Sequence, residues 1–103
     1  MEKAKVTFNY EKLQVSTELM RAMAHPLRLR ILEFIDTHGV INVNKIYSNL
    51  QIEQSITSQH LRILKVAGVV NSEREGKFIH YSINYDIINK VELAIKNFIA
   101  RNK

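Results

Sequence analysis

The segment that most constrains the fold runs from Ser55 to Ile83. Its first part, SITSQHLRILKVAGVV, places apolar or small side chains at steps of four, three and four residues, at Thr57, Leu61, Leu64 and Gly68. This spacing follows one face of an α-helix. The opposite face carries short polar and basic side chains: Gln54, Ser55, Ser58, Gln59, Arg62 and Lys65. Side chains of these types can reach phosphates and base edges in the major groove of DNA.

A β-hairpin is expected directly after this helix. Val69-Val70 and residues 78–83 (FIHYSI) flank the turn Arg74-Glu75-Gly76-Lys77, in which a cation lies on each side of the glycine. Apolar runs on both sides of a glycine-containing turn are typical of hairpins. A polar-faced helix followed by a hairpin with a basic tip is the layout of a winged helix-turn-helix, which predicts DNA binding. Arg74 and Lys77 would then hold flanking backbone or minor groove.

The rest of the chain supplies further helices. We expect helices over residues 11–23, 26–39, 44–50, 54–67 and 85–101, and a short strand over residues 40–43 that joins the wing. Pro26 suits the first position of the second helix, where a missing N–H costs nothing. The predicted fold class is mainly α with a small β-hairpin wing, in the order α-α-α-α-β-β-α. Residues 1–103 form a single domain in this interpretation.

Composition agrees with a small DNA-binding domain. The chain has 103 residues, of which 46% are hydrophobic, enough for one core. Its net charge of +5 favours a polyanionic partner. The absence of cysteine excludes disulfides, thiolate metal sites and thiol redox switches. No secretory signal and no apolar run of about 18 residues is found, so we expect a cytoplasmic protein that has no contact with membranes.

Three segments together resemble the ArsR/SmtB family of bacterial transcriptional repressors. They are MAHPLRLRILEFI (residues 23–35), SITSQHLRILKVAGVV (residues 55–70) and REGKFIHYSI (residues 74–83). The recognition helix of that family typically begins with serines and runs through a His-Leu pair into an Ala-Gly-hydrophobic end. The matching residues here are Ser55, Ser58, His60, Leu61, Ala67, Gly68 and Val69. The resemblance covers the chain from about Leu13 to Phe98, with order and spacing intact.

The resemblance implies a homodimer held by the first and last helices, bound to an inverted-repeat operator beside its own operon. The apolar residues of those helices that we expect at the interface are Leu13, Leu19, Met20, Ile87, Ile88, Val91, Ile95 and Phe98. A two-fold dimer presents two recognition helices to successive major grooves about 34–36 Å apart. The operator should therefore be a near-palindrome of double-stranded DNA.

Both metal sites known in this family lack their ligands here. The slots of its Cys-x-Cys pair hold Asn42 and Asn44, and an amide is a poor ligand for a soft cation. The slots of its zinc set on the last helix hold Tyr85, Ile87, Phe98 and Arg101. We therefore expect no metal site and no cofactor, and the effector stays unknown. The histidines lie on different elements without ligand spacing, which leaves a metal site of another kind open: His25, His38, His60 and His80.

For several residues on or near the predicted DNA surface, the sequence allows two roles. Ile56 points outward, where it either touches a thymine methyl or is an ordinary exposed apolar residue. Arg28 and Arg30 either reach backbone phosphate or face water. Glu53 replaces the usual Ser or Thr cap; its carboxylate suits a helix N-terminus but repels phosphate. Gln51 stands where the turn often has glycine.

Three classes of function can be compared with this sequence. The first is a sequence-specific transcriptional regulator, acting as a repressor; the second is a winged-helix module that binds a protein instead of DNA. The third, a small hydrolase or transferase, lacks a glycine-rich loop, a metal cluster and a carboxylate pair, and Ser58 and His60 face different sides of their helix. The recognition helix offers hydrogen-bonding side chains rather than the large apolar anchors of a protein-docking helix. The sequence favours DNA.

Overall fold

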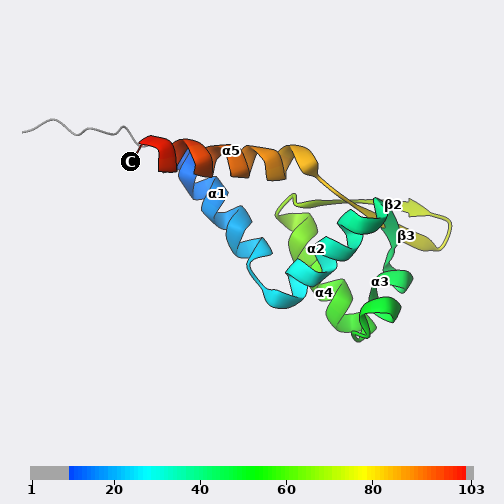
Figure 1. Ribbon diagram of the computed structural model, residues 1–103. Coiled ribbons are helices and arrows are strands. Elements are labelled where there is room, and N and C mark those ends of the chain that lie inside the picture. The colour runs from blue at the N-terminus through cyan, green and yellow to red at the C-terminus, as the bar shows by residue number, and fades with distance from the viewer. Residues whose placement is uncertain (1–9, 102–103) are drawn as a thin grey trace, which may run out of the picture.

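A computed structural model of the chain describes residues 10–101, in which five helices pack around a three-stranded antiparallel sheet (Figure 1). The elements in chain order are α1 (Tyr10–Met23), α2 (Pro26–His38), β1 (Val40–Asn42), α3 (Val43–Leu50), α4 (Gln54–Val66), β2 (Val70–Glu75), β3 (Phe78–Ile83) and α5 (Tyr85–Arg101). Every helix expected from the sequence is present, with ends within one residue of the expected ones. The winged helix-turn-helix fold is confirmed.

The sheet has the strand order β1-β3-β2. β2 and β3 form the expected hairpin, in register from Val70 opposite Ile83 to Glu75 opposite Phe78. The short strand expected near residue 40 is also present, and it pairs with the other side of β3 through Asn42 opposite His80. The order α-α-α-α-β-β-α therefore gains a strand between its second and third helices.

Figure 1 shows how these elements are arranged. α1 and α5 lie side by side at one end of the molecule, and the β2–β3 hairpin projects from the other end. The helix-turn-helix formed by α3 and α4 lies with α2 between these ends. None of the helices in the described part of the chain is long and apolar enough to cross a membrane.

Local sequence sets the ends of α2. Pro26 occupies its first turn, and the Nδ1 atom of His25 accepts a hydrogen bond from the backbone N–H of Leu27 at 3.1 Å, so a histidine caps the helix. At the other end Gly39 has a φ of 77°, a conformation that suits glycine, and its N–H donates to the carbonyl of Ile35 at 2.8 Å. These two signals explain why proline and glycine located this helix correctly in the sequence.

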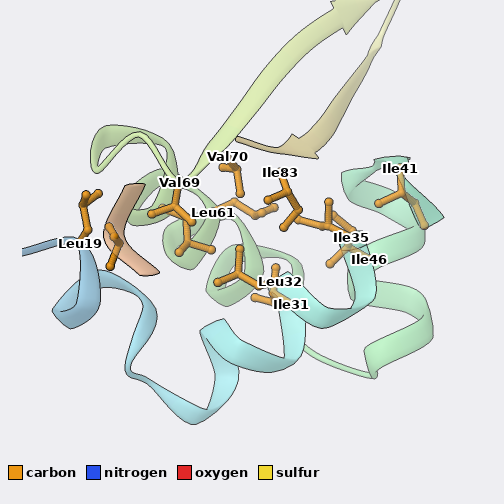
Figure 2. Packing of buried hydrophobic residues seen from close by; sticks show 12 residues of the cluster. Leu19, Ile31, Leu32, Ile35, Ile41, Ile46, Leu61, Val69, Val70 and Ile83 are labelled. Carbon is orange, nitrogen blue, oxygen red and sulfur yellow. The ribbon is translucent and has the colours of Figure 1, made fainter. Parts of the chain in front are cut away.

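The core lies between the helices and one face of the sheet (Figure 2). Its fully buried side chains come from α2, α3, α4 and the segment after α4: Ile31, Ile35, Ile46, Thr57, Leu61, Leu64 and Val69. The expected stripe of α4 is thus confirmed, apart from Gly68, which is half-buried. The hydroxyl of Thr57 donates to the carbonyl of Glu53 at 3.0 Å, which satisfies this buried polar group. Burial of one such aliphatic side chain stabilises the fold by about 1.5–3 kcal/mol.

Polar contacts fix the start of α5. Asn84, the single residue between β3 and α5, donates from its side-chain amide to the carbonyl of Gly68 and from its backbone N–H to that of Val69. The Tyr85 hydroxyl donates a short hydrogen bond to the carboxylate of Asp36 in α2, which raises the pKa of that tyrosine. The last helix is therefore anchored to the ends of both α4 and α2.

Candidate nucleic-acid interface

One face of α4 is exposed to solvent. All six polar or basic positions predicted for DNA contact are exposed: Gln54, Ser55, Ser58, Gln59, Arg62 and Lys65. Ile56 is 37% exposed and lies on the same helix. Because Leu61 and Leu64 hold the opposite face in the core, the orientation of this polar face is fixed by packing.

The turn before α4 departs from the usual helix-turn-helix sequence at two places. Gln51 has a φ of 55° and a ψ of 48°, so a residue with a side chain occupies the left-handed region that glycine favours. Glu53 takes the N-cap position of α4 without a side-chain capping bond. Arg30 from α2 donates to the carbonyl of Leu50 at 3.3 Å and so supports the end of α3. The sequence left open whether Arg30 reaches a phosphate or faces water; its side chain is exposed and has this partner within the protein.

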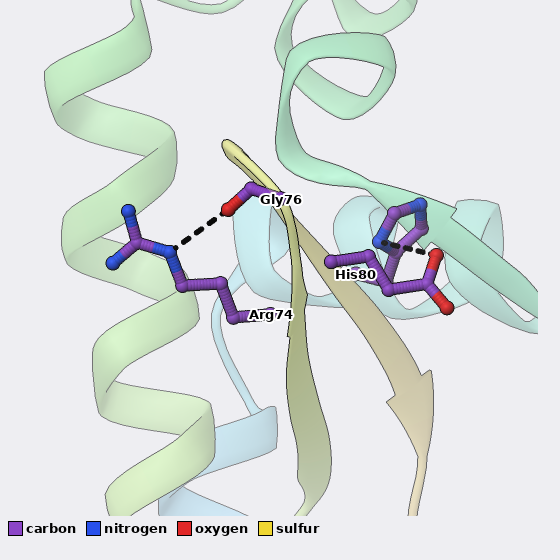
Figure 3. Close-up of polar contacts among 4 residues, drawn as sticks. Arg74, Gly76 and His80 are labelled. Carbon is purple, nitrogen blue, oxygen red and sulfur yellow. Dashed lines mark hydrogen bonds and ion pairs between the residues drawn. The ribbon is translucent and has the colours of Figure 1, made fainter.

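The wing carries its cations at the tip and on one face. Arg74 lies opposite Ile79 in the register, on the face that carries Val70 and Ile83 into the core, and its Nε donates to the carbonyl of Gly76 at 3.1 Å. Figure 3 shows the Arg74 side chain on one side of the hairpin and His80 on the other. Lys77, at the turn, has its Nζ 5.6 Å from the ring centre of Phe78.

The outer face of the same hairpin is acidic. Glu73 lies opposite His80 in the register, and the carboxylate of Glu75 is 3.8 Å from the His80 Nδ1. Both glutamates are exposed. The wing therefore presents a cation on the side of α4 and acids on the side away from it (Figure 3), a distribution that favours a polyanion on the α4 side.

Two residues in the slots of the family's metal sites, Asn42 and Tyr85, form hydrogen bonds within the protein. The Asn42 side chain accepts from the backbone N–H of Lys45 at 2.9 Å and caps α3. Tyr85, in the other slot set, bonds Asp36 as described above. The His38 Nδ1 bonds the carbonyl of Phe34 at 2.8 Å. Over residues 10–101, as far as they are described, three or more His, Cys, Asp or Glu residues nowhere gather as a metal site would require.

The sequence suggested that all four histidines lie apart, but two of them are in contact. The rings of His25 and His60 lie 4.8 Å apart, centre to centre, with planes tilted by 47°. These residues are 35 positions apart in the chain and meet only because α4 crosses the start of α2, so no local spacing could reveal them. Burial first, and then the neighbouring His25 and Arg28, lower the pKa of His60.

An apolar groove runs between α1 and α5, where the sequence predicted a dimer interface. It has a volume of 570 Å³ and is lined by residues of both helices, among them Val15, Leu19, Ile87, Val91 and Leu93. Val15 and Leu93 are 55% and 58% exposed and were missed in the sequence, although Val15 precedes Leu19 by the helical spacing of four.

The predicted interface residues differ in burial within the protomer. Leu19 and Val91 are buried within the protomer and belong to its core. Met20 is 44% exposed. The side chains of three others are half-buried: Ile87, Ile88 and Ile95. The side chains of Leu13 and Phe98 lie outside the part that the structure describes.

Comparison with known proteins gives a consistent result. Residues 25–72, from the start of α2 into β2, match the family described as "Bacterial regulatory protein, arsR family". The transcriptional repressor PagR of Bacillus anthracis is 42% identical over 88 residues, which cover 84% of each chain. The transcriptional repressor SdpR of Bacillus subtilis is 32% identical over 83 residues, covering 81% of this chain and 91% of its own.

Solved structures agree with the sequences. The crystal structure of PagR superposes with a TM-score of 0.70 at 36% identity, covering 84% of this chain and 99% of that one. The crystal structure of NolR from Sinorhizobium fredii gives a TM-score of 0.71 at 26% identity, covering 95% and 96%. With the fold, the polar face of α4 and the basic wing tip already established, the chain belongs to the ArsR family of bacterial transcriptional regulators and is a DNA-binding winged helix-turn-helix protein, not an enzyme.

Proposed function

We propose that this protein is a repressor that binds a near-palindromic operator as a homodimer. The observation that carries the proposal is the pairing of an exposed hydrogen-bonding face on α4 with a hairpin that has Arg74 on the side of α4 and Lys77 at its tip (Figure 3). Relatives named as transcriptional repressors support the choice of repression. Repression then follows from occupancy, since a dimer on an operator next to a promoter blocks access to it.

In this proposal α4 reads sequence and the wing positions the protein. Ser58, Gln59 and Arg62 reach base edges in the major groove, where amide and guanidinium groups pair with adenine and guanine respectively. Arg74 and Lys77 contact phosphates beyond the groove, which adds affinity without sequence information.

The partner of the α1–α5 groove is a second copy of the chain. Val15 and Leu93 expose apolar surface along a groove that a small core leaves uncovered, and a two-fold pairing of these helices buries both. The pairing also places two copies of α4 on one side of the dimer, as a two-fold operator requires.

The decisive experiment is selection of bound duplexes from random double-stranded DNA, followed by anisotropy titration of the selected site. We expect an inverted repeat with half-sites about one helical turn apart. The expected affinity is at least about a thousandfold tighter than that for unrelated duplex. Recovery of no preferred sequence, together with equal affinity for all duplexes, would contradict sequence-specific regulation and favour the protein-interaction module.

A further inference from the structure

Two histidine side chains meet where α4 crosses the start of α2, and an arginine of α2 lies near them. His60 projects from α4 and packs its ring against that of His25, the residue that caps α2. Arg28 lies in the first turn of α2, near enough that its charge lowers the pKa of His60. We call this group the α2–α4 cluster: His25, Arg28 and His60.

The cluster has no internal counter-charge. Within the described part of the chain, neither Arg28 nor His60 forms an ion pair with a carboxylate. The Nε of Arg28 and the Nδ1 of His60 are buried without a hydrogen-bond partner. One ring nitrogen of His25 already has a partner, because its Nδ1 accepts a hydrogen bond from the N–H of Leu27. The charge of Arg28 is therefore uncompensated by any carboxylate of the described residues, and an anion that reaches the terminal nitrogens of Arg28 from outside would supply the missing counter-charge.

The position of the cluster on α4 points to the source of the anion. Successive residues of a helix are about 100° apart, so His60 turns away from Gln59 toward the flank of the groove-facing surface. A helix with its side chains is about 10–12 Å across and the major groove is about 12 Å wide. The flanks of an inserted helix therefore face the phosphates at the groove rims. Arg28 and the positive N-terminal end of α2 lie beside this flank.

We propose that Arg28 and His60 bind one phosphate group of the operator backbone at the rim of the groove that α4 enters. The proposal rests on the proposed function. The guanidinium of Arg28 donates through its terminal nitrogens, which are not among the buried atoms, and pairs with two phosphate oxygens. His60 donates through Nε2 once it is protonated, and His25 holds the His60 ring in place.

Phosphate binding in this site is linked to a proton. Burial is the largest cause that lowers the pKa of His60, followed by the charges of His25 and Arg28 at the start of α2. The other elements that pack against α4 are α1, α3 and β2, and none of their described charged groups is among the causes. In the free protein both neighbours and burial favour the neutral ring. A phosphate beside His60 favours the charged ring, so its pKa rises in the complex. Binding then takes up a proton, and operator affinity increases as the pH falls from about 8 to about 6.

The test uses the full-length protein and its selected operator, with affinity measured against KCl concentration at pH 6 and pH 8. R28Q should lower the magnitude of the salt slope by about 0.9 per protomer and leave the preference for the operator over other sequences unchanged. R28K should restore the slope. H60Q should bind like the unmodified protein at pH 8 and lose the gain at pH 6. The matched control is K96Q, which removes an exposed charge from α5, where Lys96 pairs with Glu92.

A second measurement does not depend on the variants folding. Methylphosphonate groups, which lack the phosphate charge, are placed one at a time along the operator and tested with the unmodified protein. One position per half-site should abolish the pH dependence. The proposal is overturned if the operator is bound with the same affinity at both pH values, or if R28Q and K96Q give equal salt slopes. If the unmodified protein selects no duplex at all, the proposed function itself fails, and this outcome is distinct from the other two.

Discussion

At the scale of single residues, the backbone of Gln51 in the turn before α4 is strained, and the sequence already marks this position as unusual. Gln51 was recognised as a departure because glycine is frequent there, and the structure gives the reason, since its φ is 55°. A residue with a side chain in this region costs roughly 1–2 kcal/mol. The Gln51 side chain is exposed, and no hydrogen bond of the described structure involves it.

Replacing this residue should therefore stabilise the fold. Q51G relieves the left-handed strain but adds backbone freedom to the unfolded chain, so the net gain is about 0.5–1 kcal/mol. Urea unfolding followed by circular dichroism measures it. S48G, a change at an exposed position inside α3, is the control and should lose about 0.5 kcal/mol because its backbone is helical. A loss of stability in both variants would contradict the strain argument.

At the scale of elements, the periodicity of the sequence predicts where the helices lie but not which residues of other helices they contact. The stripe of α4 and the signals of Pro26 and Gly39 located α2 and α4 within one residue, because these signals are local. The contact of His25 with His60 was out of reach, because it depends on how two helices cross. Leu19 and Val91 show the same limit: an apolar stripe does not say whether a residue packs in its own core or against a second chain.

The division of labour between α4 and the wing predicts two kinds of variant. S58A, Q59A and R62A should reduce the preference for the operator over unrelated duplex, each by about 1–3 kcal/mol where a bidentate base contact is lost. R74A and K77A should weaken binding to both duplexes about equally and lower the salt slope by about 0.9 each per protomer. Anisotropy titrations at several salt concentrations separate the two. A change of sequence preference in the wing variants alone would reverse the assignment of the reading element.

At the scale of the whole molecule, the two ends have different tasks. The hairpin and α4 are proposed to face DNA, and the α1–α5 groove at the opposite end is proposed to bind a second copy of the chain. The exposed residues Val15 and Leu93 mark the proposed dimer surface, whereas the buried residues Leu19 and Val91 belong to the core of the protomer.

Leu93 is the residue to test for assembly. L93D places a charge on the exposed wall of the groove and should convert a dimer at micromolar concentration into a folded monomer with much weaker operator binding. V91D is less informative because Val91 belongs to the protomer core, where a charge disrupts folding. Sedimentation velocity gives the mass, and N89D, an exposed site on α5 that does not line the groove, is the control. A dimer that survives L93D would place the interface elsewhere.

The response to metals should also differ from that of family members that sense them. Zinc, cadmium, lead and arsenite at modest excess should not release this protein from its operator, because the slots for soft ligands hold Asn42 and Asn44 and the chain has no cysteine. Peroxide should also leave binding unchanged over short exposures, since methionine reacts more slowly than a thiolate. Operator anisotropy with each agent, and with chelator added back, is the measurement. Stoichiometric, reversible release by any of these metals would reveal a site built from histidines.

The strand order β1-β3-β2 leaves two open edges on a very small sheet. Unpaired strand edges invite pairing with other chains, and a wing that must stay exposed to reach DNA cannot hide its edge under a helix. β1 limits the risk by its length of three residues. β2 limits it by composition, because Glu73, Arg74 and Glu75 put alternating charges along the outer half of the strand. The charged residues of the wing should therefore also disfavour edge-to-edge pairing with other chains.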